Sequence, residues 1–140
     1  MTIEYYYEVD FELIEEKKYT EWIISILNLH KYSLGALNYI FCSDDYLLPM
    51  NQRYLGHNTL TDIITFDYSN GTVLSADIFI SIDRVKDNST KYIVGFDKEL
   101  RRVMIHGVLH LMEYDDKTFE DREVMRNKED ELIKMFHVEQ

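Results

Sequence analysis

Alternating hydrophobic and polar positions predict β-strands in the first part of the chain. Strand-like runs cover residues 2–13, 34–43, 61–69 and 72–82. The first run contains Tyr5, Tyr6 and Tyr7, which we expect to divide between the core face and the solvent face of a sheet. The last two runs flank Asn70-Gly71, a dipeptide typical of tight turns, and they are therefore predicted to form a β-hairpin.

Hydrophobic residues at helical spacing predict helices between and after these strands. The helical patterns cover residues 19–29, 46–56, 83–93, 97–112 and 118–136. Ser43, followed by Asp44 and Asp45, is typical of an N-cap for the second helix. Pro49 is expected to interrupt that helix in its first turn.

The first and last helices each carry a predicted buried side. Trp22 on the first helix is expected in the core. The last helix begins with Thr118 and Asp121 in a pattern like a capping box. Its inner stripe is predicted to consist of Val124, Leu132 and Met135, with its many charged residues facing solvent.

The order of elements predicts the fold class. Strands and helices mix up to about residue 82, and only helices follow. This order favours an α+β fold in which a mixed sheet of about four strands is layered with helices. A chain of 140 residues suits one domain, so we expect residues 1–140 to form a single domain.

Composition narrows the cellular setting. No run approaches the ~20 apolar residues that a membrane span needs, and we expect no membrane association. The acidic start has neither the basic nor the apolar region of a signal peptide. The lone Cys42 cannot form an internal disulfide, which fits a reducing compartment. These features together predict a cytoplasmic protein.

Charge limits the kinds of nucleic-acid binding that the chain can support. The net charge of −11 argues against a nonspecific nucleic-acid coat, because phosphate binding depends on Lys and Arg. Most of the negative charge lies in residues 1–21 and 113–131, while residues 83–102 carry six bases and four acids. A local positive face is therefore possible in the last of these segments, although taken alone an ordinary solvated helix surface is the preferred interpretation.

Two histidines stand four residues apart in the segment "HGVLHLMEYDD", residues 106–116. His106 and His110 share one face of the predicted helix, so both side chains can reach one metal ion. On an uninterrupted helix Asp116 would lie on another side, about 9 Å further along the axis. A turn near residues 113–115 would bring it back, giving two His and one carboxylate and an open position for water.

Gly107 adds a second clue to this segment. Gly inside a helix costs roughly 1 kcal/mol relative to Ala, which predicts close approach of another part of the chain. It also stands where HExxH peptidases carry their general base, so peptide hydrolysis is disfavoured. For an isolated pair, histidines that cap or line a core are the better interpretation, and the helix context with Asp116 shifts the balance towards a metal. His30, His57 and His137 are expected to be surface or locally hydrogen-bonded residues.

The same segment resembles the HGxLHLxGYDH signature of the YbeY family, bacterial endoribonucleases that mature ribosomal RNA. "MNQRYLGHNTLTDIITFD" is similar to the family segment LNxxYRxxDxPTDVLSF, and "SADIFISIDRV" is similar to its following strand, GDIxI. The similarities occur in the family's order and cover most of residues 36–136.

The resemblance implies a metal-dependent nuclease specific for single-stranded RNA, acting in ribosomal RNA maturation and ribosome quality control. It implies a zincin-like metal helix that holds one Zn²⁺ per chain through His106, His110 and Asp116. Asp116 stands where the family more often has a third histidine. The implied partners are ribosomal RNA and ribosomal subunits, with ribosomal or assembly proteins as further candidates.

Two positions depart from the family pattern. Glu113 replaces a glycine, which removes conformational freedom at positive φ and places a carboxylate near the metal. Leu55 replaces an arginine that is a proposed phosphate contact. Arg102, one helical turn before His106, is our first substitute for that contact and Arg53 our second; a surface salt bridge of either arginine to an acid is an equal alternative.

Two other functions stay open at this stage. The chain can be a noncatalytic ribosome-associated assembly factor, with a structural metal and an acidic surface that binds basic ribosomal proteins. It can also be a metal-dependent hydrolase of another substrate, because ligand spacing alone does not distinguish a phosphodiester from an amide. A structural metal site would be closed by a fourth protein ligand such as Glu113, whereas a catalytic site keeps a position for water.

Overall fold

The structure, a computed structural model, describes residues 1–138, with side chains as far as Phe136. It contains a four-stranded sheet of order β1-β2-β4-β3. Strands β1, β2 and β4 run parallel, and β3 pairs antiparallel with β4 at the edge. The elements in chain order are β1 (Thr2–Tyr7), α1 (Glu16–Leu29), β2 (Ser33–Cys42), α2 (Asp44–Leu55), β3 (Ile63–Asp67), β4 (Val73–Ser81), α3 (Ile82–Lys91), α4 (Phe96–Leu111) and α5 (Phe119–Val138). The predicted α+β class with a mixed four-stranded sheet is confirmed.

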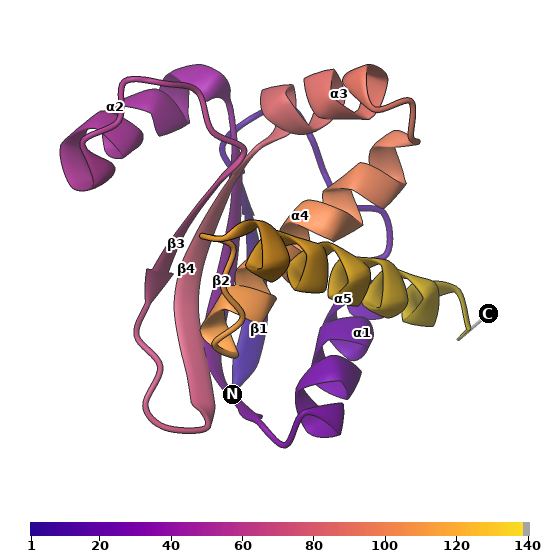
Figure 1. Ribbon diagram of the computed structural model, residues 1–140. Helices are drawn as coiled ribbons and strands as arrows, with labels where there is room; N and C mark the ends of the chain where they lie inside the picture. Colours follow the sequence, from indigo (N-terminus) through magenta and orange to yellow (C-terminus); the bar gives the residue numbers. More distant parts are fainter. Residues whose placement is uncertain (139–140) are drawn as a thin grey trace.

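Helices cover the sheet unequally on its two faces. Figure 1 shows α1, α4 and α5 gathered on one side of the sheet, with α2 on the other side. The main core lies between the sheet and the group of α1, α4 and α5. Alternate side chains of β4 point into it, as the two-residue period of a strand requires. These inward side chains are Leu74, Ala76, Ile78 and Ile80, each no more than 1% exposed. A smaller cluster on the α2 side is built on Cys42, Leu47 and Ile64.

All four predicted strands are present, but their first and last residues differ from the prediction. Tyr5 and Tyr7 are half-buried and stack on rings of β2, whereas Tyr6 is 46% exposed, so the predicted division of the tyrosines is confirmed. The hairpin is also confirmed, with Gly71 at φ 61° in its turn. The first strand, however, ends at Tyr7 instead of reaching residue 13, because the chain leaves the sheet to begin α1.

The helix caps were largely predictable from the sequence. Ser43 Oγ accepts a hydrogen bond from the Tyr46 amide at 3.1 Å, and Thr118 Oγ1 accepts one from Asp121 at 3.0 Å. The prediction for Pro49 was wrong, because α2 runs unbroken from Asp44 to Leu55 with the proline inside it.

The predicted inner stripe of α5 was wrong at one position. Leu132 is fully buried and Met135 packs against the core, as predicted, but Val124 is 55% exposed. Its neighbour Met125 is 2% exposed and takes the core position. Trp22 is buried as predicted, and its indole nitrogen donates to the Leu132 carbonyl at 2.9 Å.

Three helices end in the same way, with a residue in the left-handed region just beyond the C-cap. In α4 the Glu113 amide donates to the His110 carbonyl and the Tyr114 amide to the Leu109 carbonyl, both at 3.0 Å. This pair of hydrogen bonds is a Schellman motif. The left-handed residues are Lys31 (φ 62°) after α1, Ile93 (φ 56°) after α3 and Glu113 (φ 71°) after α4. The motif turns the chain sharply, and after α4 it determines where residues 114–118 lie.

Candidate metal centre

Helix α4 lies against the sheet through Gly107. A Cβ atom at this position would come within 3.0 Å of Ile63 Cδ1 and 3.1 Å of Ile78 Cδ1. Such distances are shorter than ordinary van der Waals contact between carbon atoms, so glycine allows the helix to approach β3 and β4 this closely. The close approach predicted for Gly107 is therefore present, and it brings His106 and His110 to the region beside β3.

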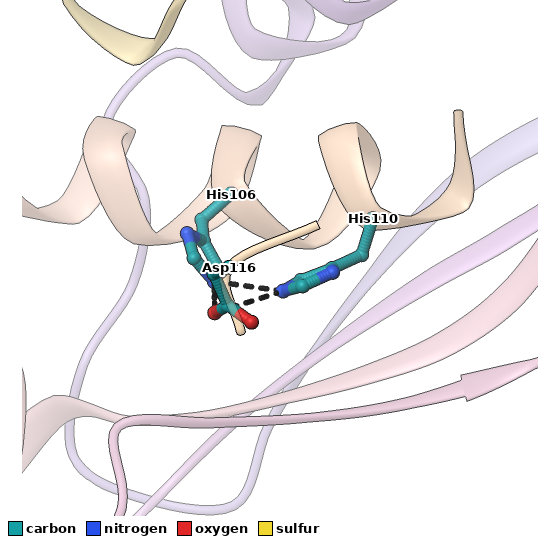
Figure 2. A group of neighbouring side chains, drawn as sticks. All are labelled: His106, His110 and Asp116. Atoms are coloured by element: carbon teal, nitrogen blue, oxygen red, sulfur yellow. Dashed lines mark hydrogen bonds and ion pairs between the residues drawn. The ribbon is translucent and has the colours of Figure 1, made fainter. Parts of the chain in front are cut away.

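The two histidines converge on one point. Figure 2 shows their rings projecting from the same side of α4, with Asp116 opposite the helix and directed at both. The Nε2 atoms of His106 and His110 are 3.0 Å apart. Asp116 Oδ2 lies 3.3 Å from each of these nitrogens.

The Schellman motif after α4 explains how Asp116 reaches this point. Glu113 takes a positive φ and reverses the chain, so that Asp116 folds back towards the helix that precedes it. The Asp115 side chain then accepts a hydrogen bond from the Asp116 amide at 2.8 Å. The turn predicted at residues 113–115 is thus present, even though its positive-φ residue is Glu113 and not a glycine.

The three donor atoms fit the geometry of a small divalent ion. Zinc–nitrogen bonds of about 2.0–2.1 Å place tetrahedral ligands about 3.3–3.4 Å from one another. The observed separations of 3.0, 3.3 and 3.3 Å match that triangle closely. Two imidazoles and one carboxylate are also donors that zinc accepts, so this group can hold a metal ion.

Glu129 on α5 supports the group from behind and was not identified from the sequence. Its Oε2 accepts a hydrogen bond from His106 Nδ1 at 2.6 Å. A proton on Nδ1 leaves the Nε2 lone pair free to face His110 and Asp116, which is the orientation that a metal ligand needs. Burial lowers the pKa of His106, but the hydrogen bond and the charge of Glu129 outweigh it and raise the pKa overall.

Arg102 is held in a network of acids beside the histidines. Its guanidinium donates to Glu129 at 2.9 Å and to Asp130 at 2.5 Å, and it lies 3.9 Å from Glu99. Glu129 therefore joins Arg102 to His106 through its two oxygens. Arg102 thus forms the salt bridges that were the alternative to a phosphate contact. Glu99 is the most distant of its three acidic partners.

A cavity of about 720 Å³ opens beside the donor group. His106, Asp116 and Arg102 line it together with Asp62, which precedes β3, and Glu99 on α4. Burial raises the pKa of Asp62 and of Glu99, and nearby positive charges, His106 for Asp62 and Arg102 for Glu99, offset part of that rise. The volume lies within the range of about 300–1,000 Å³ that is usual for ligand sites.

The remaining candidates from the sequence lie elsewhere. Arg53 is in the last turn of α2, 5.7 Å from the ring of Tyr54, and is not among the described residues that line the cavity. Glu113 is exposed and is not part of the three-donor group found in the described chain. His30 Nδ1 lies 2.8 Å from the Ile26 carbonyl oxygen and His57 is exposed, as expected, whereas the His137 side chain lies outside the described residues.

Fold and site together define the class of protein: an α+β domain whose central helix presents two histidines, with a returning aspartate, at a cavity beside the sheet. Comparison with known families identifies the family to which this domain belongs. The family model described as "Endoribonuclease YbeY" matches residues 5–137, and the chain belongs to this family. Membership supports an RNA-cleaving role, that of a nuclease hydrolase.

Curated relatives span almost the full chain. "Endoribonuclease YbeY" of Flavobacterium psychrophilum is 53% identical over 138 residues, 99% of both chains. The protein of that name from Flavobacterium johnsoniae is 49% identical with the same coverage, and that of Bacteroides thetaiotaomicron is 43% identical over 122 residues, 87% of this chain and 89% of its own. The solution structure of TM1509 from Thermotoga maritima superposes with a TM-score of 0.67 at 25% identity, covering 99% of this chain and 91% of that one.

None of the helices in the described part of the chain is long and apolar enough to cross a membrane.

Proposed function

We propose that this chain is a zinc-dependent endoribonuclease that cleaves single-stranded RNA in ribosomal RNA maturation and ribosome quality control. Residues 1–140 act as one metallohydrolase domain in the cytoplasm, on ribosomal RNA within or released from ribosomal subunits, with ribosomal or assembly proteins as partners. The observation that carries the proposal is the triangle of His106, His110 and Asp116 donor atoms at tetrahedral separations, in a member of an endoribonuclease family.

The ligand group supports catalysis because it leaves a coordination position open. Three protein donors converge, and the exposed Glu113 is not among them in the described residues. Zn²⁺, when bound, supplies Lewis acidity that polarises a phosphate oxygen and lowers the pKa of water. A structural site would instead need a fourth protein ligand, so the geometry favours an enzyme over a noncatalytic assembly factor.

The chain's own residues have distinct parts in this proposal. His106, His110 and Asp116 bind the ion, and Glu129 keeps the His106 lone pair directed at it. Arg102 steadies the scissile phosphate by exchanging Asp130, whose side chain is 47% exposed, for a phosphate oxygen. Arg53 on α2 is the second candidate for that contact and would act on a more distant part of the RNA.

The first test is elemental analysis of protein purified without chelators or a nickel-binding tag. We expect about one zinc per native chain. His110→Ala and Asp116→Ala should each lose most of it, and His57→Ala, an exposed histidine outside the site, should keep it. Absence of metal from the native chain, or equal metal in all variants, would refute the ligand assignment.

Cleavage assays then test the reaction. The native chain should cut a single-stranded RNA at internal positions and leave duplex RNA intact, and His110→Ala should lose cleavage while keeping its circular dichroism spectrum. A native chain that binds zinc but cuts no RNA would favour the noncatalytic assembly factor. Cleavage of unfolded protein in place of RNA would favour a hydrolase of another substrate.

A further inference from the structure

The cavity continues away from the donor group as a groove between α3 and α5. Its floor is α4, and one wall carries Tyr92, the C-cap of α3. The other wall carries Phe119, the first residue of α5, close in sequence to Asp116. Both aromatic side chains are exposed, Tyr92 by 55% and Phe119 by 65%.

Two arginines share the α5 wall with Phe119. Arg122 and Arg126 are exposed residues that line the groove. The Arg122 side chain donates to the Lys117 carbonyl at 3.2 Å, and Arg126 forms no ion pair within 4 Å with any residue in the described part of the chain. The charge of Arg126 acts on Glu99, but neither guanidinium has to give up a salt bridge to bind an anion, whereas Arg102 has to exchange one.

The acids of the groove do not cancel these charges evenly. Glu99 and Glu129 lie deep, at 5% and 4% exposure, and Glu129 is already paired with Arg102 and His106. The α5 wall carries one exposed acid as well, Glu123, so its two arginines outnumber its acids, and the paired Glu129 lies towards the floor. Exposed rings beside exposed guanidinium groups are the combination that holds unpaired nucleotides, with bases on the rings and phosphates on the cations.

We propose that this groove binds single-stranded RNA beside the candidate metal centre, with bases stacked on Phe119 and Tyr92 and phosphates held by Arg122 and Arg126. The inference rests on the proposed RNA-cleaving function and adds a basis for its single-strand preference. Bases inside a duplex are stacked on one another, so they cannot reach side chains in a groove of this kind. The cavity of about 720 Å³ lies within the size range of about 300–1,000 Å³ that is usual for ligand sites.

The test is a binding measurement that does not depend on cleavage. A fluorescently labelled RNA decamer is titrated with His110→Ala and, separately, with metal-free native protein, and anisotropy gives Kd. In the His110→Ala background, Phe119→Ala and Tyr92→Ala should each weaken binding about 5- to 150-fold. Phe119→Trp should restore binding and Phe119→Leu should not, because leucine replaces the apolar contact but not the ring.

A matched probe separates stacking from general contact. A decamer with abasic sites should bind the parent protein more weakly, and Phe119→Ala should cause little further loss with it, as a double-mutant cycle requires. Arg122→Gln and Arg126→Gln should each reduce the slope of log K against log salt by about 0.7. Tyr68→Ala, at an exposed tyrosine outside the groove, is the control and should change neither quantity.

The outcomes distinguish this inference from the proposed function. The proposed RNA-binding role of the groove is refuted if RNA binding is unchanged in both Phe119→Ala and Tyr92→Ala. It is also refuted if neither parent protein binds the RNA. If the native chain cleaves RNA and Phe119→Ala leaves KM and kcat unchanged, the groove fails while the nuclease assignment stands. Binding that depends on Phe119 and Tyr92 in a chain that cuts no RNA supports the groove and refutes the nuclease.

Discussion

Glu129 Oε2 lies 2.6 Å from Nδ1 of His106, a residue 23 positions earlier in the chain. The other oxygen of Glu129 accepts from Arg102 at 2.9 Å, so one buried carboxylate joins an arginine on α4 to a candidate metal ligand on the same helix. This relationship ties the orientation of His106 to the packing of α5 on α4, whereas the three candidate ligands found among the described residues all lie outside α5.

Replacement of Glu129 should weaken metal binding without removing a ligand. Supporting hydrogen bonds of this type are typically worth 10- to 100-fold in affinity, so Glu129→Ala is expected to raise the zinc Kd by that factor. Glu129→Gln should have a smaller effect, because its amide oxygen can still accept from Nδ1. Competition with a chromophoric chelator measures the Kd, and Glu131→Gln, at an exposed glutamate paired with Lys128, is the control. Equal affinities in all variants would show that Glu129 has no part in the site.

Glu99 should make the stability of the metal-free chain depend on pH. Burial raises the pKa of Glu99, partly offset by Arg102, so the folded chain binds this proton more tightly than the unfolded chain does. The resulting stabilisation is present below the unfolded pKa of about 4.3 and is lost as pH rises through the folded value. The native chain is therefore expected to lose more stability than Glu99→Gln between pH 4 and pH 7, measured by urea unfolding. Equal pH profiles for the two chains would contradict this expectation.

Glu113→Gly should stabilise the protein. Glu113 holds φ at 71°, a conformation that costs a residue with a side chain roughly 1–2 kcal/mol and that glycine adopts freely. After the entropy that glycine loses on folding, we expect a gain of about 1 kcal/mol in the free energy of unfolding. Lys117→Gly is the matched control, because Lys117 is not among the positive-φ residues and glycine there brings no such relief. A loss of stability in Glu113→Gly would contradict the assigned strain.

Ile93 is strained in the same way and tests the same principle away from the candidate metal centre. It follows α3 with φ at 56° and is 91% exposed, so its β-branched side chain adds strain and little burial. Ile93→Gly should raise the free energy of unfolding by about 1 kcal/mol, measured by urea unfolding. Ile14→Gly removes an isoleucine that is 84% exposed but has no positive φ, and it should bring no gain. The same gain at both positions would mean that removal of an exposed apolar side chain, and not backbone strain, is responsible.

The sequence by itself determined the local features of this protein. Strand alternation, the caps at Ser43 and Thr118, and the turn after α4 depend on residues within a few positions of one another, and their signals are therefore readable along the chain. The spacing of His106 and His110 is local in the same sense, because one helical turn places both on one face.

Only the tertiary structure decided which distant residues meet. The angle at which α5 crosses α4 buries Met125 and leaves Val124 exposed, and it brings Glu129 to His106 and Arg102. No pattern within α5 states that angle, because it depends on the shapes of both helix surfaces where they pack. A helix periodicity predicts that one face is buried, but the neighbouring element selects the face. Here that selection also places the Glu129 carboxylate behind His106, the candidate metal ligand.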